Sequence, residues 1–384
     1  MVRKTVAEIN QYEGTTVNPM QSPEQVYELY SVPSFDTEYP EIIAGADIGS
    51  SKVTVQEGDV LICKINPRIN RVWVVKHNTE HPLLASSEWI VVRNPGMDSD
   101  YLRWYFSSPT FRTLLNSEVA GIGGSLTRAQ PKRVAQYTVP ICPFEEQQRI
   151  SASLNQVESL ISLRKQQIAK LDELVKARFV EMFGDPVTNP MQWPVHELSE
   201  YIEFLTSGSR GWSQYFSDDG EYFITIKNVK NCHITLDDVQ HVMPPDNAEA
   251  KRTKVQEGDL LISITADLGR TGVGTTDIAG HRAYINQHLT CIRLNKNVLH
   301  PLYVAYFMES EAGKEQFQAK NQSAVKAGLN FNSINSLRLL VPPLALQHQF
   351  AAFVAQIDQQ KLTIQHSLDK LELLKKALMQ KYFG

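Results

Sequence analysis

One eight-residue phrase occurs twice in this chain. Residues 55–62 read VQEGDVLI and residues 255–262 read VQEGDLLI, so the copies differ by a single Val-to-Leu change and lie 200 positions apart. A chance match in a common strand–turn pattern would end with the phrase itself. An internal duplication would extend the match and would fix the organisation of the whole chain.

The match continues well beyond the phrase at nearly the same offset. Small drifts of one or two residues, as in Tyr105-Phe106 against Tyr306-Phe307, are what short loop insertions produce. The pairs that keep the offset are Arg93 with Arg293, Pro143 with Pro343, Gln147 with Gln347, Leu171 with Leu371, Ala177 with Ala377, and Phe183-Gly184 with Phe383-Gly384. The sequence therefore indicates a duplication, with halves of roughly 1–185 and 186–384.

Each half ends in a long helical pattern. The two patterns follow Pro143 and Pro343 and close at Gly184 and Gly384, with no glycine or proline between. Apolar residues recur at alternating spacings of four and three, which is the heptad seam of a coiled coil. The seam residues are Ile150, Leu154, Val157, Ile161, Ile168, Leu171 and Val175 in the first helix, and Phe350, Val354, Ile357, Ile364, Leu368, Leu371 and Leu378 in the second.

Charged residues occupy some seam positions, and they alternate between the copies. Arg164 and Arg178 stand where the second copy is apolar, and Lys361 and Lys375 stand where the first copy is apolar. Two interpretations are open. Long basic side chains can extend past the edge of a seam to reach water, or they can fix the register of two helices that pair with each other.

The segments ahead of the helices, 1–142 and 186–342, show short strand-like runs separated by turn signals, with helical patches between them. The predicted fold is α+β, with globular domain 1–142, helix 143–185, globular domain 186–342 and helix 343–384. If the termini of the second globular domain lie close together, the two helices must run antiparallel. They would then form a coiled coil, and the duplication would give the molecule pseudo-twofold symmetry.

Composition narrows the class of protein. Of the 384 residues, 42% are hydrophobic and 21% are charged, which is typical of a soluble globular protein. No apolar run approaches the ~20 residues of a membrane helix, so no membrane partner is expected, and the scattered cysteines suit a reducing cytoplasm. The net charge of −4 argues mildly against coating nucleic acid through overall charge, but it leaves room for a local basic surface.

The sequence lacks the motifs of the enzymes that act on DNA. Its Pro-Pro pairs, MPPD at 243–246 and VPPL at 341–344, do not fit the Asn- or Asp-Pro-Pro-aromatic loop of an adenine methyltransferase. It has no phosphate-binding loop for an ATP motor, and its histidines form no metal-spaced cluster. The acids in PDNAEAK, at 245–251, are too close together for a nuclease centre. We therefore expect no catalytic residue, metal or cofactor in this chain.

Several stretches resemble the specificity subunits of type I restriction–modification systems. They are the proline-led EEQQRI entry to the first helix, the Phe-Gly end of each helix, the GD-[VL]-LI phrases, the SVPSFD and KINPRINRVW stretches, and the SGSRGW and NQHLTCIRL stretches. The resemblance covers essentially the whole chain. It implies a non-catalytic subunit with two target recognition domains, each reading one half of a bipartite, asymmetric site in double-stranded DNA.

The resemblance also implies partners. The two helices would set the spacing between the half-sites and bind two methyltransferase subunits, and motor-nuclease subunits would join through that core. S-adenosylmethionine and ATP are then expected on the partner subunits. Two rival functions stay open on the residues alone, namely a coiled-coil scaffold that carries two protein-interaction modules without nucleic acid, and an enzyme with its own methyl transfer.

The two halves diverge after the shared strand, as two readers of different sequences require. The first half continues as CKINPRINRVW and the second as SITADLGRTGVG. Basic, amide and hydroxyl groups in such loops suit contacts to phosphates and bases. The candidates in the first domain are Lys64, Asn66, Arg68, Asn70, Arg71, Ser125, Thr127, Arg128, Lys132 and Arg133. Those in the second are Ser209, Arg210, Trp212, Lys227, Asn228, Arg270, Thr271, Asn286, Gln287, His288, Lys326 and Asn330.

Each of these residues also has an ordinary structural interpretation. Arg71 or Arg93 could form a surface ion pair, and Trp212 could be a core aromatic residue. The sequence does not choose between the two interpretations.

Overall fold

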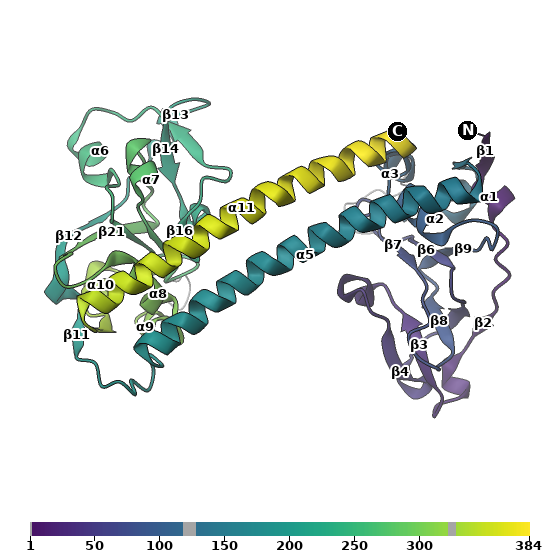
Figure 1. The fold of residues 1–384 in the computed structure, drawn as a ribbon, viewed down its shortest axis with the longest axis horizontal. Coiled ribbons are helices and arrows are strands. Elements are labelled where there is room, and N and C mark those ends of the chain that lie inside the picture. The colour runs from purple at the N-terminus through teal and green to yellow at the C-terminus, as the bar shows by residue number, and fades with distance from the viewer. Residues whose placement is uncertain (1, 118–127, 322–327) are drawn as a thin grey trace. The chain divides into compact units, whose positions relative to one another are not determined.

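The computed structural model describes residues 2–117, 128–321 and 328–384 (Figure 1). The chain divides into two units. Unit 1 comprises Met1–Gln166 and Gln365–Gly384, and unit 2 comprises Gln167–Ile364. This division differs from the boundaries expected from the sequence, because each long helix is shared between the two units.

The strands of unit 1 form a five-stranded sheet, a three-stranded sheet and a two-stranded ribbon within the described residues. The five-stranded sheet has the order β2 (Thr16–Val17), β5 (Lys52–Thr54), β8 (Leu83–Ser86), β3 (Val26–Tyr30) and β4 (Glu41–Ala44). The three-stranded sheet has the order β7 (Val72–Val74), β6 (Val60–Cys63) and β9 (Trp89–Val92), and the ribbon pairs β1 (Val2–Thr5) with β10 (Thr138–Ile141). The helices that precede the long one are α1 (Val6–Ile9), α2 (Ser99–Phe106), α3 (Pro109–Ser117) and α4 (Pro131–Val134).

Unit 2 contains a six-stranded sheet, a four-stranded sheet and a two-stranded ribbon in its described part. The six-stranded sheet has the order β12 (Ile202–Ser207), β21 (Leu289–Leu294), β18 (Leu260–Ser263), β19 (Thr271–Val273), β16 (Cys232–Ile234) and β15 (Val229–Lys230). The four-stranded sheet has the order β13 (Phe216–Ser217), β17 (Gln240–Val242), β14 (Glu221–Ile224) and β20 (Tyr284–Ile285), and the ribbon pairs β11 (Val195–Glu197) with β22 (Arg338–Leu340). The short helices are α6 (Ala248–Thr253), α7 (Thr276–Gly280), α8 (Pro301–Glu309), α9 (Glu311–Ala319) and α10 (Phe331–Asn335).

The repeated phrase forms the same turn in both units. Gly58 and Gly258 have φ values of +87° and +81°, a conformation that favours glycine. The aspartate that follows is buried, and its carboxylate accepts a hydrogen bond from the amide of Gln56 (2.9 Å) or Gln256 (2.8 Å). This turn leads into the fully buried strands β6 and β18.

The same aspartates bind the paired arginines that lie further along the chain. Arg93 makes two hydrogen bonds of 2.7 Å to Asp59, and Arg293 makes bonds of 2.9 and 3.2 Å to Asp259. Both pairs are of the bidentate kind, which is the strongest geometry for this interaction. The repeated phrase therefore serves the fold, because it joins a turn to the neighbouring strand through a buried ion pair.

The two long helices begin and end where the sequence predicts. They are α5 (Phe144–Phe183) and α11 (Leu344–Phe383), each 40 residues long. Near the start of each helix a buried glutamine binds the globular part. Gln147 accepts from the amide of Asp98 (3.0 Å), and Gln347 accepts from the amide of His300 (2.8 Å). Asp98 and His300 are the N-caps of α2 and α8, so one glutamine fixes two helix starts in each half.

Burial along the two long helices follows the predicted seam. Every seam residue named from the sequence is buried or partly buried, whereas leucines off the seam are exposed, including Leu163 at 51% and Leu373 at 68%. In each unit the helices pair antiparallel. In unit 1 Glu158 and Lys165 of α5 bind Lys375 (2.6 Å) and Glu372 (3.2 Å) of α11, and in unit 2 Asp172 binds Lys361.

These ion pairs decide the role of the charged seam residues. Lys361 and Lys375 each bind a carboxylate of the opposite helix, so the lysines contribute to register. Arg178 differs, since its ion pair is to Glu181 of its own helix and its guanidinium lies 5.8 Å from the ring centre of Phe353 on α11. A further contact to α11 comes from the sheet, where His233 lies 2.7 Å from Asp358. Burial lowers the pKa of His233, but the hydrogen bond and charge of Asp358 outweigh it and raise the pKa above its ordinary value.

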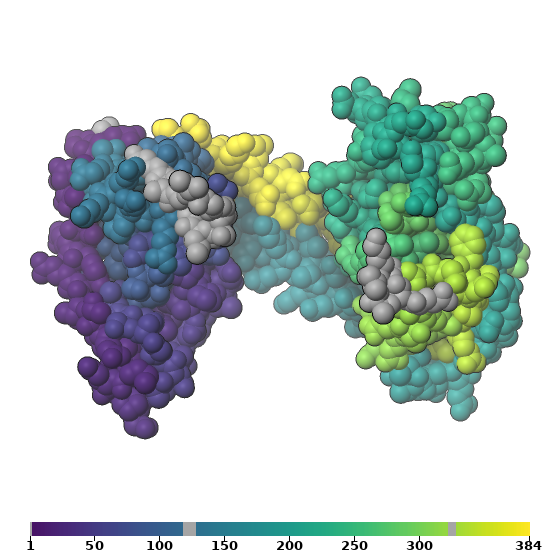
Figure 2. All heavy atoms as spheres, turned by 180° about the vertical axis from the view of Figure 1, so that it is seen from behind, coloured from purple at the N-terminus to yellow at the C-terminus, as the bar shows by residue number. Residues whose placement is uncertain are grey.

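The end of each long helix packs into a core built mainly by the other half of the sequence. Phe383, at the end of α11, is 3% exposed and contacts Tyr101 of unit 1 with ring centres 5.4 Å apart. Phe183, at the end of α5, is 1% exposed and lies 4.7 Å from Tyr303 of unit 2. Figure 2 shows the yellow end of α11 against the blue and purple surface of unit 1. The division into units follows from this exchange of helix ends.

We expect Asp259→Asn to destabilise unit 2 by about 3 kcal/mol, because it leaves the Arg293 guanidinium without its buried counter-charge. Arg293 is a quarter exposed, which keeps the loss at the low end of the usual range. Urea unfolding followed by tryptophan fluorescence measures the change. The control is Asp218→Asn at an exposed aspartate, and equal unfolding midpoints for the two variants would contradict the role of the pair.

We expect Phe383→Ala to destabilise unit 1 by about 3–5 kcal/mol, since it removes a buried aromatic ring from the core around Tyr101. Leu373→Ala is the matched control, because Leu373 lies on the same helix and is largely exposed, and it should change stability by less than about 0.5 kcal/mol. Hydrogen exchange of α2 locates the effect. Unchanged protection of α2 in Phe383→Ala would show that the helix end does not support that core.

Candidate nucleic-acid interface

Three segments meet beyond the end of β6 in unit 1, and we call this meeting point the junction. The amide of Lys64 donates to the carbonyl of Glu88 (2.9 Å), and the amide of Ala129 donates to the carbonyl of Lys64 (2.9 Å). A β-bridge between Ile65 and Arg128 completes the arrangement. The junction therefore brings two candidate stretches, the loop 64–71 and the segment that starts at Arg128, into direct contact.

Unit 2 has the same junction at positions 200 residues later. The amide of Ile264 donates to the carbonyl of His288 (3.0 Å), the amide of Leu329 donates to the carbonyl of Ile264 (2.9 Å), and Thr265 forms a bridge with Gly328. The loop after β18, the segment 286–288 and the segment from 328 onward therefore meet as their counterparts do. The junction groups most of the described candidates of unit 1, and in unit 2 it groups Arg270, Asn286, Gln287, His288 and Asn330.

A tight loop in unit 1 presents Arg68. Asn66 and Asn70 have φ values of +48° and +52°, a conformation that asparagine adopts more readily than most residues. The amide of Asn70 donates to Pro67 (3.0 Å), and its side chain donates to the carbonyl of Phe106 (3.0 Å). The guanidinium of Arg112 donates to the carbonyl of Arg68. These bonds hold the loop, while the side chain of Arg68 is exposed.

Arg71 is mainly a residue of the domain's own structure. Its side chain is 16% exposed, and its guanidinium lies 3.8 Å from Asp36. Phe35, next to that aspartate, packs against Trp73 with ring centres 5.7 Å apart. The SVPSFD stretch therefore lies beside the loop 64–71. Arg71 and Arg93 both form ion pairs, and the partner of Arg93 is the fully buried Asp59.

Three buried polar atoms at this place have no hydrogen-bond partner among the described residues. They are Asn70 Oδ1, Arg71 Nε and Glu88 Oε2. Folded proteins satisfy more than about nine tenths of such atoms, so their occurrence around one loop is unusual. The fold by itself does not account for the polar side chains gathered here.

The remaining candidates of unit 1 lie on the segment after the junction. Arg128 is 56% exposed and forms an ion pair with Glu88 (3.1 Å). Lys132 and Arg133 are exposed on α4. Two further candidates, Ser125 and Thr127, lie outside the described residues, as does Lys326 in the second half.

In unit 2 the exposed or partly exposed candidates are mostly charged or amide residues. Arg270 forms an ion pair with Asp267 in the loop after β18. His288 lies 2.7 Å from the hydroxyl of Thr265, and its amide donates to Asn286 (3.1 Å). The full set is Arg210, Lys227, Arg270, Asn286, Gln287, His288 and Asn330, of which Asn330 also caps α10.

Four candidates of unit 2 are buried, and we therefore exclude them as surface residues that could contact DNA. Trp212 is 3% exposed and lies stacked 5.7 Å from Phe223, in an aromatic core cluster. Ser209 is bonded to Thr253 (3.0 Å) and Asn228 to Thr225, both inside the unit. Thr271 is fully buried on β19. From sequence alone, a polar or aromatic residue of this kind is equally consistent with a binding site and with a core in which its hydrogen bonds are satisfied.

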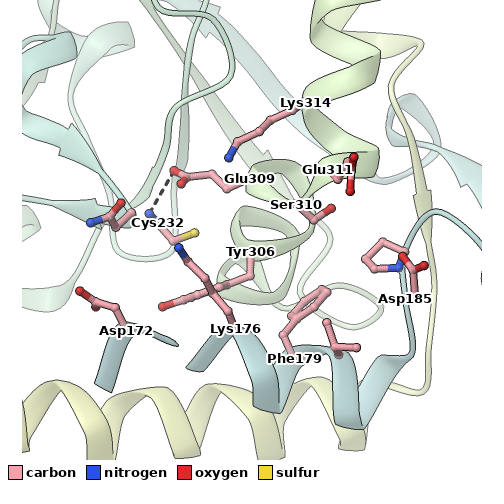
Figure 3. Close-up of a pocket in the computed structure, with 13 residues that line it drawn as sticks. Asp172, Lys176, Phe179, Asp185, Cys232, Tyr306, Glu309, Ser310, Glu311 and Lys314 are labelled. Carbon is pink, nitrogen blue, oxygen red and sulfur yellow. Dashed lines mark hydrogen bonds between the residues drawn. The ribbon is translucent and has the colours of Figure 1, made fainter. Parts of the chain in front are cut away.

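Thr271 is held by Glu309, which also borders a cavity (Figure 3). One oxygen of Glu309 accepts from the amides of Thr271 (2.9 Å) and Cys232 (3.1 Å). The cavity measures about 430 Å³ and mixes both charges with aromatic rings, including Lys176, Phe179 and Tyr306. Burial raises the pKa of the Cys232 thiol, so this thiol is protonated at neutral pH. The cavity offers no concentration of positive charge and is separate from the junction.

Sequence reasoning missed Glu88 and Thr265, although both belong to the junction. The duplication carries the signal that would have found Glu88, because it stands 200 positions before the candidate His288. Sequence reasoning also missed Glu28, which is fully buried in β3 and accepts hydrogen bonds from Asn78 and Thr79. These bonds fix the loop 76–81, which carries the exposed Lys76.

None of the described helices combines the length and apolarity that crossing a membrane requires. No group of three or more histidine, cysteine, aspartate or glutamate side chains in the described ranges is arranged to hold a metal ion. The four cysteines are buried free thiols.

Comparison with known proteins gives one consistent family. Residues 192–373 match the model of the type I restriction modification DNA specificity domain. The chain is 25% identical to a putative type I restriction enzyme MjaX specificity subunit of Methanocaldococcus jannaschii over 50% of this chain and 46% of that protein. It is 17% identical to the type I restriction enzyme EcoBI specificity subunit of Escherichia coli over 73% of this chain and 64% of that protein. The chain thus spans about half of the first relative and less than two thirds of the second.

A solved structure supports the fold over the full length. The S subunit of a type I restriction-modification system from M. genitalium aligns with 100% of this chain and 96% of its own, with a TM-score of 0.59 and 12% sequence identity. The duplicated phrase, the two 40-residue helices and the family match to the second half agree with one another. By these matches the chain is similar to type I restriction enzyme specificity subunits, and its residues 192–373 match their DNA specificity domain.

Proposed function

We propose that this chain is the DNA sequence-recognition subunit of a type I restriction–modification complex. Each globular domain reads one half of a bipartite, asymmetric site in double-stranded DNA. One observation carries the proposal, namely that both units build the same backbone junction and fill it with different polar side chains. Two readers of different sequences need a shared frame with variable contacts.

The long helices act in this proposal as a spacer and as docking surfaces. Their antiparallel contacts within each unit support a two-helix coiled coil with pseudo-twofold symmetry, which would present equivalent surfaces to two methyltransferase subunits. Exposed leucines off the seam support docking, since such residues are available to a partner. They are Leu160, Leu163 and Leu174 on α5, and Leu362, Leu373 and Leu374 on α11. Motor-nuclease subunits would join through the methyltransferases.

The chain is non-catalytic in this proposal, and the partners supply the chemistry. S-adenosylmethionine would bind to the methyltransferase subunits and ATP to the motor-nuclease subunits. The complex would work in the cytoplasm, where free thiols such as Cys63 and Cys142 stay reduced. The chain contributes the choice of site and the distance between its halves.

The proposal is tested by expressing the full chain with its methyltransferase subunits in a bacterial host free of DNA methylation. We expect methylated bases to map to one two-part motif with a fixed gap, and we expect omission of this chain to abolish methylation. Methylation by this chain alone would contradict a non-catalytic role. A stable complex with the methyltransferases that neither shifts duplex DNA in a gel nor directs methylation would favour a protein scaffold.

We expect Arg68→Ala to weaken binding to the target duplex or to relax one half-site, because a base-reading arginine contributes ~1–3 kcal/mol. Gel-shift titration of the complex at several salt concentrations separates the two outcomes, since loss of a phosphate contact reduces the salt dependence of binding. Arg149→Ala, at an exposed arginine on α5, is the control. Affinity and half-site preference that both match the control would remove the loop 64–71 from the interface.

A further inference from the structure

Because the chain is duplicated, a comparison of its two halves indicates which residues the shared fold requires. Lys64 and Ile264 occupy the same place in the two junctions and make the same pair of backbone bonds, at 2.9 Å in unit 1 and at 3.0 and 2.9 Å in unit 2. Those bonds do not depend on which side chain stands at the position, since only backbone atoms take part. Side chains at the junction are therefore free to differ between the halves without cost to the frame.

The side chains that differ most are those at the rim of the junction. Unit 1 has Glu88 and Arg128, joined by an ion pair of 3.1 Å. At the corresponding positions unit 2 has His288 and Gly328, and the imidazole of His288 is bonded to Thr265 (2.7 Å) instead. A charged pair in one half is thus replaced by an imidazole–hydroxyl pair in the other.

Two observations indicate that the pair in unit 1 does more than stabilise its domain. Arg128 is 56% exposed, and an ion pair at that exposure adds little to stability. The second carboxylate oxygen of Glu88, Oε2, is buried with no hydrogen-bond partner among the described residues. An acidic group that the fold leaves half-satisfied, beside an exposed guanidinium, is poorly explained by folding alone.

The chemistry of the two pairs suits different base pairs. A guanidinium donates two parallel hydrogen bonds to the O6 and N7 atoms of guanine, and a carboxylate accepts from the amino group of cytosine. An imidazole and a hydroxyl carry no fixed pair of donors and so lack that preference for guanine. The pair of unit 1 lies beside the loop that presents Arg68, and the pair of unit 2 lies beside the candidates Asn286 and Gln287.

We propose that the junction is a specificity-determining position of each domain. Arg128 with Glu88 reads a G·C base pair in one half-site, and His288 with Thr265 reads a different base pair at the equivalent position of the other half-site. This inference rests on the proposed function, because it names the residues by which that function distinguishes its two half-sites. It predicts that changes at the two junctions act on separate halves of one motif.

The test maps methylated bases in the genome of a methylation-free host that expresses the full chain, or a variant, with its methyltransferase subunits. We expect Arg128→Ala to make one G·C position of one half-site degenerate and to leave the other half-site unchanged. His288→Ala should do the same at one position of the other half-site. Discrimination at the affected position should fall roughly 5- to 150-fold, as the loss of one good base contact predicts.

Two further variants separate base reading from other roles. Lys132→Ala removes a neighbouring exposed cation on α4, and it should lower methylation at all sites without altering the motif. His288→Asn retains a hydrogen-bonding group beside Thr265, so the domain stays folded while the motif still changes. A wild-type motif that survives both Arg128→Ala and His288→Asn would overturn the inference alone. A wild-type complex that directs no two-part motif would overturn the proposed function and the inference together.

Discussion

The burial of each long helix's last aromatic residue in a core of the other half is the interaction on which the architecture depends. Phe383 enters the core around Tyr101, and Phe183 enters the core around Tyr303. Each of these tyrosines also donates a 2.9 Å hydrogen bond to the strand just before a long helix, at Pro140 or Leu340. One tyrosine thus joins the start of one long helix to the end of the other, so neither unit has a complete core without a helix from the other half of the sequence.

This exchange explains why periodicity predicted the helices but not the units. Alternating spacings of four and three predict a buried stripe on each helix, and the named residues of the two stripes are buried or partly buried. The terminal Phe183 and Phe383 were noticed in sequence only as the ends of a repeat. Whether a terminal aromatic residue is exposed or inserted in a core depends on what surrounds it in space, which the spacing of residues along one helix does not contain. The domain boundaries expected at 142 and 342 therefore divide the chain differently from its packing.

The candidate site shows the same limit at the level of single residues. The sequence identified the loop after the repeated strand, and the structure brings that loop against the segment that begins at Arg128. The sequence could not distinguish Arg68, which is exposed, from Trp212, which fills an aromatic core. Both types suit DNA contacts, and only tertiary packing distinguishes them. The sequence patterns did not indicate Glu88, because an acidic residue is not an obvious partner for DNA. Its offset of 200 residues from His288 could nevertheless be read from the duplication.

The net charge of −4 and the pairing of candidate cations with carboxylates have the same electrostatic effect, because both reduce the unpaired positive charge of the chain. Arg128 faces Glu88, Arg71 faces Asp36 and Arg270 faces Asp267. A cation that already has a carboxylate partner gains less from a phosphate than a free one, because binding must replace an existing interaction. In the proposed function this pairing would lower non-specific affinity, which comes largely from protein cations that contact the phosphate backbone. In the proposed function, binding would then depend more on base contacts strong enough to replace each ion pair. It would also depend on engaging two half-sites at once, where the second contact is made at high effective concentration. An acidic chain suits the proposed role, because it would read its target DNA without binding tightly to every duplex.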